Sequence, residues 1–163
     1  MKDGEKMPPF SYLYILERYE ETEMIRNFQQ SDMEQVITIW LEASIQAHDF
    51  VASEFWESKS IDMRETYIPS SETYVYEEDG IIKGFIALYN NTVAALFISP
   101  SHQRHGIGSQ LIAKSKEIRS KLELTVYKEN HNSTTFYKKC GFKIMHEQID
   151  THTGYPELFM VFP

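Results

Sequence analysis

Apolar residues recur along this chain at two spacings, one typical of helices and the other of strands. Between residues 33 and 45 they follow one another by three or four positions, which places them on one helix face: Met33, Val36, Ile37, Trp40, Leu41 and Ile45. Ser31 and Glu34 have the spacing of a capping box and predict where this helix begins. A second, less regular helix is expected within 53–67, ended by Pro69.

Strands are expected where apolar residues alternate with polar ones or form short runs. Tyr74 and Tyr76 alternate with Val75, and Asp79-Gly80 after them is a strong signal for a hairpin turn. The expected strands are 24–28, 73–78, 82–89, 92–98, 122–127, 142–149 and 157–162. Two further helices are expected at 107–120 and at 133–140, the latter with Gly141 as its stop.

The order of these elements predicts an α/β fold, with a mixed sheet of about seven strands flanked by about four helices. Strand 92–98 leads through helix 107–120 to strand 122–127, which is the arrangement of a parallel crossover. Residues 1–23 differ in composition from the rest of the chain and contain no motif. We interpret them as an N-terminal extension of unknown role, and residues 24–163 as one domain.

The segment 92–109 combines a buried strand, a turn and the start of a helix. Pro100 ends the strand because it cannot donate a hydrogen bond to a neighbouring strand. The first amides of a helix have no intrahelical partners, and with the helix dipole they can bind a pyrophosphate. Gly106 and Gly108 let the backbone approach a phosphate closely, and Arg104 and His105 can add charge. The same glycines also fit a tight turn with a helix cap, so this motif alone does not show whether the segment binds a phosphate.

Composition narrows the class of protein. A net charge of −8 disfavours binding to nucleic acid or to an anionic membrane, and is compatible with a cationic substrate such as an amine. The single cysteine, Cys140, excludes a disulfide within the chain and fits a reducing cytoplasm; we interpret it as a small core residue. No apolar run reaches the length of a membrane span, and the histidines lack the spacing of metal ligands. We therefore expect a cytoplasmic protein without a metal.

A second motif lies at residues 130–142. Five residues match the pattern Asn-x-x-Ala-x-x-Phe-Tyr-x-x-x-Gly-Phe, and Ser133 stands in place of its alanine; the matching residues are Asn130, Phe136, Tyr137, Gly141 and Phe142. Together with Gln103-x-x-Gly106-x-Gly108, this motif resembles the GCN5-related N-acetyltransferase (GNAT) superfamily, and its small single-domain bacterial members in particular. The resemblance covers residues 24 to about 162. It implies the GNAT fold, acetyl-CoA as co-substrate, and transfer of an acetyl group to a primary amine by direct attack in a ternary complex.

The resemblance also implies roles for individual residues. The backbone of Phe97 and Ile98 would pair with the pantetheine arm, in a gap between strands 92–98 and 122–127. The amides of 103–109 would bind the pyrophosphate, and Tyr137 would protonate the leaving thiolate as the catalytic residue. The implied cofactor-binding residues are Phe97, Ile98, Gln103, Arg104, His105, Gly106, Ile107, Gly108, Ser109, Asn130, Ser133 and Tyr137.

The sequence says less about the residues that bind the acceptor amine. His48, Phe50 and Tyr127 are candidate substrate contacts, although His48 also fits a capping or loop histidine. Strand 92–98 contains no acidic residue, whereas some GNAT enzymes carry a general base there, so the base stays open. The amine could belong to a small molecule or to a peptide, and both a monomer and a homodimer are possible. The alternative function is a GNAT fold that senses acyl-CoA or docks a partner without turnover.

Overall fold

The computed structural model describes residues 24–163, and the N-terminal extension expected at 1–23 lies outside the described residues. Seven strands form one sheet in the order β1-β2-β3-β4-β5-β7-β6. All neighbouring strands are antiparallel except β4 and β5, which are parallel. This confirms the mixed sheet and its crossover. The strands are β1 (Ile25–Asn27), β2 (Glu72–Glu78), β3 (Ile81–Tyr89), β4 (Thr92–Ile98), β5 (Leu122–Tyr127), β6 (Lys143–Ile149) and β7 (Pro156–Phe162).

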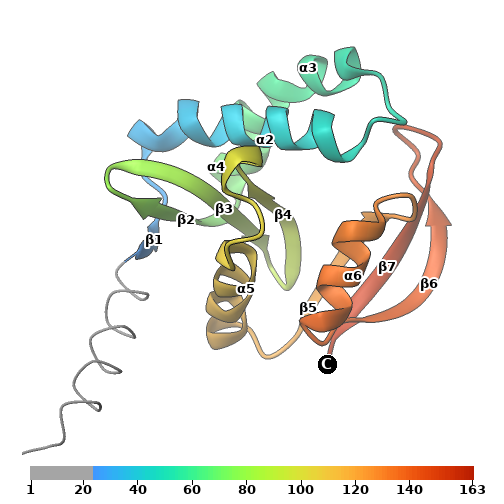
Figure 1. Cartoon of the computed structure of the whole chain (residues 1–163). Helices are drawn as coiled ribbons and strands as arrows, with labels where there is room; N and C mark the ends of the chain where they lie inside the picture. Colours follow the sequence, from blue (N-terminus) through green and yellow to red (C-terminus); the bar gives the residue numbers. More distant parts are fainter. Residues whose placement is uncertain (1–23) are drawn as a thin grey trace, which may run out of the picture.

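Helices cover both faces of this sheet. They are α2 (Met33–Ala47), α3 (Ser53–Asp62), α4 (Ile68–Ser70), α5 (Ile107–Ile118) and α6 (His131–Lys139). Figure 1 shows α2 and α3 together on one side of the sheet and α5 on the other. The strands alternate between two cores as predicted, since Tyr74 and Tyr76 pack on the α5 side and Val75 on the α2 side. Burial of these two apolar layers provides the main stabilisation of the fold.

The start of α2 differs from the prediction. Ser31 lies within a short 3-10 turn (Gln30–Asp32), so the expected capping box of Ser31 and Glu34 is wrong. Instead the buried Asp32 carboxylate accepts the Gln29 backbone N–H at 2.7 Å and pairs with the Arg26 guanidinium at 2.8 Å. These contacts from Arg26 lower the pKa of Asp32 despite its burial. The capping box is therefore formed by Gln29 and Asp32, two residues earlier than predicted, and Arg26 connects it to β1.

The second predicted helix also continues further than expected. After α3, one π-helical turn (Met63–Tyr67) leads directly into α4, and Pro69 lies inside this last short helix. The prediction that Pro69 ends the helix is therefore wrong by a turn. Proline is tolerated in the first turn of a helix because its missing N–H would have no partner there.

The sheet opens between its two parallel strands. β4 and β5 pair at Thr92 and Glu123, whereas β5 pairs with β7 along its whole length. A β-bulge lies in β4, where the register with β3 shifts between Val93 and Ala95. A bulge bends its strand and increases the local twist. The remainder of β4 therefore diverges from β5, and the splay implied by the resemblance is present.

Candidate active site

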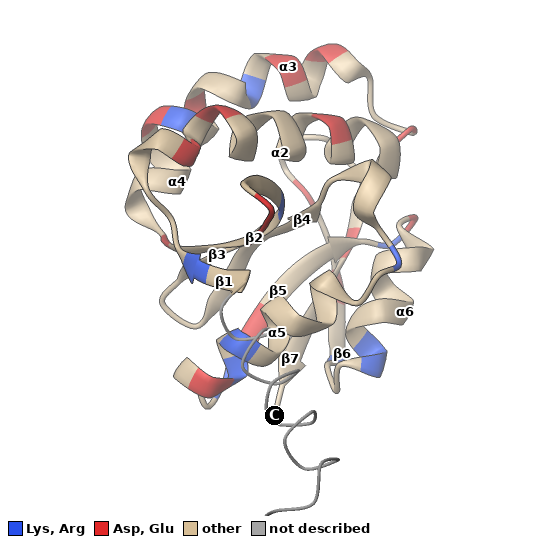
Figure 2. Cartoon of the chain, turned by 60° about the vertical axis from the view of Figure 1, so that its left-hand side comes forward, with Lys and Arg blue, Asp and Glu red and all other residues tan. Residues whose placement is uncertain are grey.

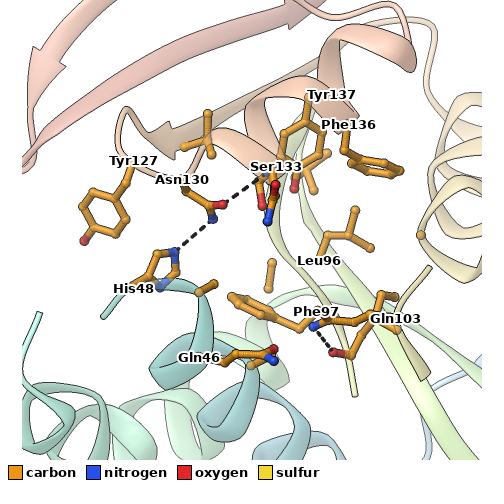
Figure 3. A pocket seen from close by; sticks show the side chains of 18 of the residues that line it. Gln46, His48, Leu96, Phe97, Gln103, Tyr127, Asn130, Ser133, Phe136 and Tyr137 are labelled. Carbon is orange, nitrogen blue, oxygen red and sulfur yellow. Dashed lines mark hydrogen bonds between the residues drawn. The ribbon is translucent and has the colours of Figure 1, made fainter. Parts of the chain in front are cut away.

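A cleft of about 1280 Å³ lies where β4 and β5 diverge. Its walls come from β4, from the turn before α5, from β5 and α6, and from the end of α2. In Figure 3, Asn130, Ser133 and Tyr137 lie on one side of the cleft and Phe97, Gln103 and Gln46 on the other. Since β5 does not pair with β4 beyond Thr92, this edge of β4 faces the cleft at Phe97 and Ile98. An extended ligand arm can add to such an edge as a further strand.

The N-terminus of α5 forms one end of the cleft. Arg104 and Gly106 have φ angles of 64° and 79°, and Gly106 is the residue that caps the helix. This left-handed turn directs the first amides of α5 toward the cleft, and no acidic side chain occupies the first turn. A Cβ on Gly106 would meet no atom within 4 Å, so the space above the turn is open. Free amides, the helix dipole and Arg104 together make a site that fits a pyrophosphate.

Gly108 has a different role from Gly106. A Cβ built on Gly108 would lie 3.2 Å from the Phe136 ring of α6, which is closer than ordinary packing allows. The glycine therefore lets α5 and α6 approach each other beneath the diverging strands. The sequence suggested two roles for Gly108, the approach of a phosphate or a tight turn with a helix cap, and the structure adds this contact between helices.

Asn130 connects the two sides of the cleft. Its side-chain oxygen accepts the Ser133 backbone N–H at 3.2 Å and so caps α6. Its side-chain nitrogen lies 3.4 Å from Nε2 of His48, as the dashed lines in Figure 3 show. Because the cap uses the oxygen, the amide nitrogen donates to His48, whose proton is then on Nδ1. Asn130 and His48 are 82 residues apart in the chain.

His48 is buried in an aromatic cage at the end of α2. Its ring centre lies 5.0 Å from that of Trp56, 5.1 Å from that of Tyr127 and 5.9 Å from that of Phe50. Burial lowers its pKa to about 4, so the imidazole is neutral at physiological pH. Nδ1 is buried without a hydrogen-bond partner among residues 24–163. His48 is therefore a cleft residue, and its backbone N–H also ends α2 by donating to the Ser44 carbonyl.

Two tyrosines line the cleft, and their hydroxyls differ in what they contact. The Tyr127 hydroxyl donates to Asp150 at 2.5 Å, and in Figure 3 it points away from Tyr137. Within residues 24–163 no hydrogen bond occupies the Tyr137 hydroxyl. Burial raises the pKa of Tyr137, aided by the nearby Cys140, so its phenol keeps its proton. Tyr137 is thus the protonated phenol in this cleft that is free to donate to a ligand.

The fold and these motifs have counterparts among known proteins. The family model described as "Acetyltransferase (GNAT) domain" matches residues 24–158. The chain belongs to the GNAT acetyltransferase family. Two Escherichia coli K12 proteins named peptidyl-lysine N-acetyltransferase are similar to it. YiaC is 30% identical over 141 residues, which are 86% of this chain and 97% of YiaC, and YjaB is 29% identical over 122 residues, which are 74% and 82%.

Solved structures show the same fold. The solution structure of apo YjaB from E. coli superposes with a TM-score of 0.74 at 26% identity, over 84% of this chain and 95% of that one. The PaiA N-acetyltransferase of Thermoplasma acidophilum, crystallised with coenzyme A, gives 0.71 at 20% identity, over 84% and 96%. The GNAT fold predicted from the two motifs is therefore confirmed, as is an acetyltransferase with acetyl-CoA as co-substrate.

The GNAT cleft gathers most residues that the sequence singled out. Those lining it are Phe97, Ile98, Gln103, Arg104, Gly106, Ile107, Gly108, Ser109, Asn130, Ser133, Tyr137, His48 and Tyr127. Ile107 is 4% exposed, so only its backbone is available there. His105 and Phe50 lie outside the lining; His105 is exposed, and Phe50 packs behind His48 and Tyr127.

Sequence reasoning missed further lining residues, including Asp150 and Glu157. They come from the hairpin of β6 and β7, where no local motif marks them. Residues 24–163 contain no group of three or more metal-binding side chains that could hold a metal ion. None of the helices in this range has the length and apolar character required to cross a lipid bilayer.

Proposed function

We propose that this GNAT enzyme acetylates the ε-amine of lysine residues in peptides or proteins. Two observations support a lysine acceptor: the similar E. coli proteins are named peptidyl-lysine N-acetyltransferases, and the segment that supplies α2 and α3 is acidic. Residues 33–64 contain two basic residues, Lys59 and Arg64, and six acids: Glu34, Glu42, Asp49, Glu54, Glu57 and Asp62. Figure 2 shows acidic positions along α2 and α3. Such a surface attracts a cationic acceptor.

The proposed acetyl-CoA site follows the cleft from α5 to the gap between the strands. The amides at the start of α5, with Arg104, would bind the pyrophosphate, and the edge of β4 at Phe97 and Ile98 would pair with the pantetheine arm. Acetyl-CoA supplies an activated acetyl group as a thioester. An N–H on the free edge of β4 would stabilise the oxyanion that forms when the amine attacks directly.

The proposed catalytic residue is Tyr137. The observation that supports it is the contrast between the two cleft tyrosines, because the Tyr127 hydroxyl is already bonded to Asp150. A phenol that keeps its proton and has no competing acceptor can donate that proton to the thiolate sulfur as it leaves. The enzyme needs no covalent intermediate, so Cys140 has no part in this chemistry. A monomer or a homodimer in the cytoplasm is part of the same proposal.

Exchange of Tyr137 for phenylalanine tests this function. Tyr137→Phe keeps the ring between Phe136 and Phe142 and removes only the hydroxyl. With a lysine peptide as acceptor, kcat should fall by roughly 10²–10⁴-fold, the usual effect of losing a positioned general acid. KM for acetyl-CoA should stay the same, because the lost interaction forms only in the transition state.

Tyr89→Phe is the matched control, because Tyr89 is 55% exposed at the end of β3 and lies outside the cleft. It should leave both kinetic constants unchanged. Wild-type turnover by Tyr137→Phe would contradict the catalytic assignment. A wild-type protein that binds acetyl-CoA and acetylates no lysine peptide would support the alternative of an acyl-CoA sensor.

A further inference from the structure

A second cavity of about 320 Å³ adjoins the cleft on the α3 side of β4. Its lining is largely apolar, and it shares several walls with the cleft, among them Trp40, Trp56, Met63, Ala95, Tyr127 and Asp150. Among residues 24–163, Asp150 is the one acid that lines both cavities; Asp49, Glu129 and Glu157 line the cleft alone. The Asp150 carboxylate thus lies where the apolar second cavity meets the cleft in which acetyl transfer would occur.

Three hydrogen bonds hold the Asp150 side chain at this junction. The Tyr127 hydroxyl donates to Oδ2 at 2.5 Å, the Thr153 hydroxyl donates to Oδ2 at 2.8 Å, and the His152 backbone N–H donates to Oδ1 at 3.1 Å. Burial opposes ionisation of Asp150, but these hydrogen bonds outweigh it and lower its pKa. No basic side chain pairs with Asp150 within residues 24–163. Its negative charge therefore remains available for a ligand, on Oδ1 above all.

We propose that Asp150 is the specificity-determining residue that binds the ammonium group of the incoming lysine, whose aliphatic stem lies along the apolar walls of the second cavity. This rests on the proposed function, which it extends by naming the residue that recognises the acceptor. A lysine side chain requires such a pair of environments, a channel for four methylenes and a charged acceptor at its end. Trp56 and Tyr127 supply aromatic walls, which also favour a cation.

An unpaired polar atom in the same walls also indicates a ligand. Trp56 is 8% exposed, and its indole Nε1 has no hydrogen-bond partner among residues 24–163. A buried donor without a partner costs free energy in the free protein, and a ligand carbonyl group can recover that cost. Lys59 is the one lysine or arginine that lines the second cavity, and it is 4.0 Å from Asp62, which offsets its charge.

Binding of two unreactive peptides tests this proposal without requiring turnover. The probes are capped Ala-Ala-Xaa-Ala-Ala peptides, with lysine or uncharged norleucine at the centre, titrated calorimetrically into the full chain saturated with coenzyme A, which has no acetyl group to transfer. The wild type should bind the lysine peptide at least about tenfold more tightly, as expected of an interaction with a charged group. Asp150→Asn should remove this preference and leave the affinity for coenzyme A unchanged.

Glu117→Gln is the matched control, since it removes the same charge from α5 outside both cavities, and it should keep the full preference. If Asp150→Asn fails to fold, Asp150→Ser replaces it, because a serine hydroxyl can still accept the turn N–H. Equal binding of both peptides to the wild type, or binding of neither, overturns the proposal, as does a preference that survives at Asp150→Asn. An enzyme that shows the Asp150-dependent preference but transfers no acetyl group would instead overturn the proposed function alone.

Discussion

At the scale of the residue, burial determines the protonation of His48, which the sequence left open as a substrate contact or as a capping or loop histidine. It lies among Phe50, Trp56 and Tyr127, with one ring nitrogen near the Asn130 amide. Its pKa of about 4 makes it a neutral acceptor at physiological pH rather than a cation. His48 therefore adds no positive charge to the side of the cleft where we propose that the ammonium group of the acceptor binds.

The same pKa predicts a dependence of stability on pH. An unfolded histidine has a pKa near 6.5 and the folded His48 about 4, so only the unfolded chain takes up this proton between those values. The contribution of His48 to the free energy of unfolding is therefore fully present above pH 6.5 and is lost as the pH falls toward 4. This loss is at most about 3 kcal/mol. Urea unfolding from pH 7 to pH 4.5 should show a shallower decline for His48→Gln than for the wild type.

The exposed His152 provides the comparison for this experiment. His152→Gln should keep the decline of the wild type, since His152 is exposed in the turn between β6 and β7. Parallel declines for wild type and His48→Gln would mean that His48 is accessible to protons in the folded state. The comparison uses slopes, so a constant loss of stability in either variant does not affect it.

At the scale of the element, the N-terminus of α5 depends on one residue in a left-handed conformation. Gly106 has a φ of 79° and faces open space, so an alanine there meets backbone strain but no clash. Gly106→Ala should lower the free energy of unfolding by about 1–2 kcal/mol. It should also weaken binding of acetyl-CoA, because the turn that aims the α5 amides is disturbed. Urea unfolding and titration calorimetry measure the two effects.

Gly80→Ala is a matched control for the backbone strain that Gly106→Ala introduces. Gly80 has a φ of 77°, faces open space like Gly106, and lies in the hairpin between β2 and β3, away from the cleft. Gly80→Ala should cost similar stability and leave the affinity for acetyl-CoA intact. Equal losses of affinity in both variants would show that the effect is one of general stability. Gly108→Val is less informative, because its side chain would displace Phe136.

At the scale of the whole molecule, we propose that residues 24–163 form a domain that folds without the preceding segment. The family match begins at residue 24, and Arg26 ties β1 to both Asp32 and Glu77 within that range. A chain that starts at Met24 should have the circular dichroism of the full chain. At a free acetyl-CoA concentration about one hundred times Kd, ligand binding should stabilise it by about 2.7 kcal/mol. An unfolded or insoluble truncated chain would show that residues 1–23 are required for the fold.

The sequence by itself determined the order of the elements and the position of the glycine turn at which we propose that the pyrophosphate binds. The strands at 92–98 and 122–127 were predicted with their observed ends, and the stop at Gly141 was correct, with a φ of 94°. These features depend on residues a few positions apart, whose side chains set the local backbone through periodicity, proline and glycine. The GNAT motifs are local in the same sense, which is why the sequence alone indicated the family.

Only the tertiary structure decided how the acceptor side of the cleft is built. The Asp150 carboxylate accepts a hydrogen bond from Tyr127, 23 residues away in the chain, and His48 contacts Asn130, which is 82 residues away. Arg26 of β1 pairs with Asp32 at the start of α2. The width of the gap between β4 and β5 depends on a bulge whose effect appears only when strands pair. Contacts of this kind join elements that are distant in the chain. Their geometry follows from how both cores pack against one sheet, and no local pattern of residues records that packing.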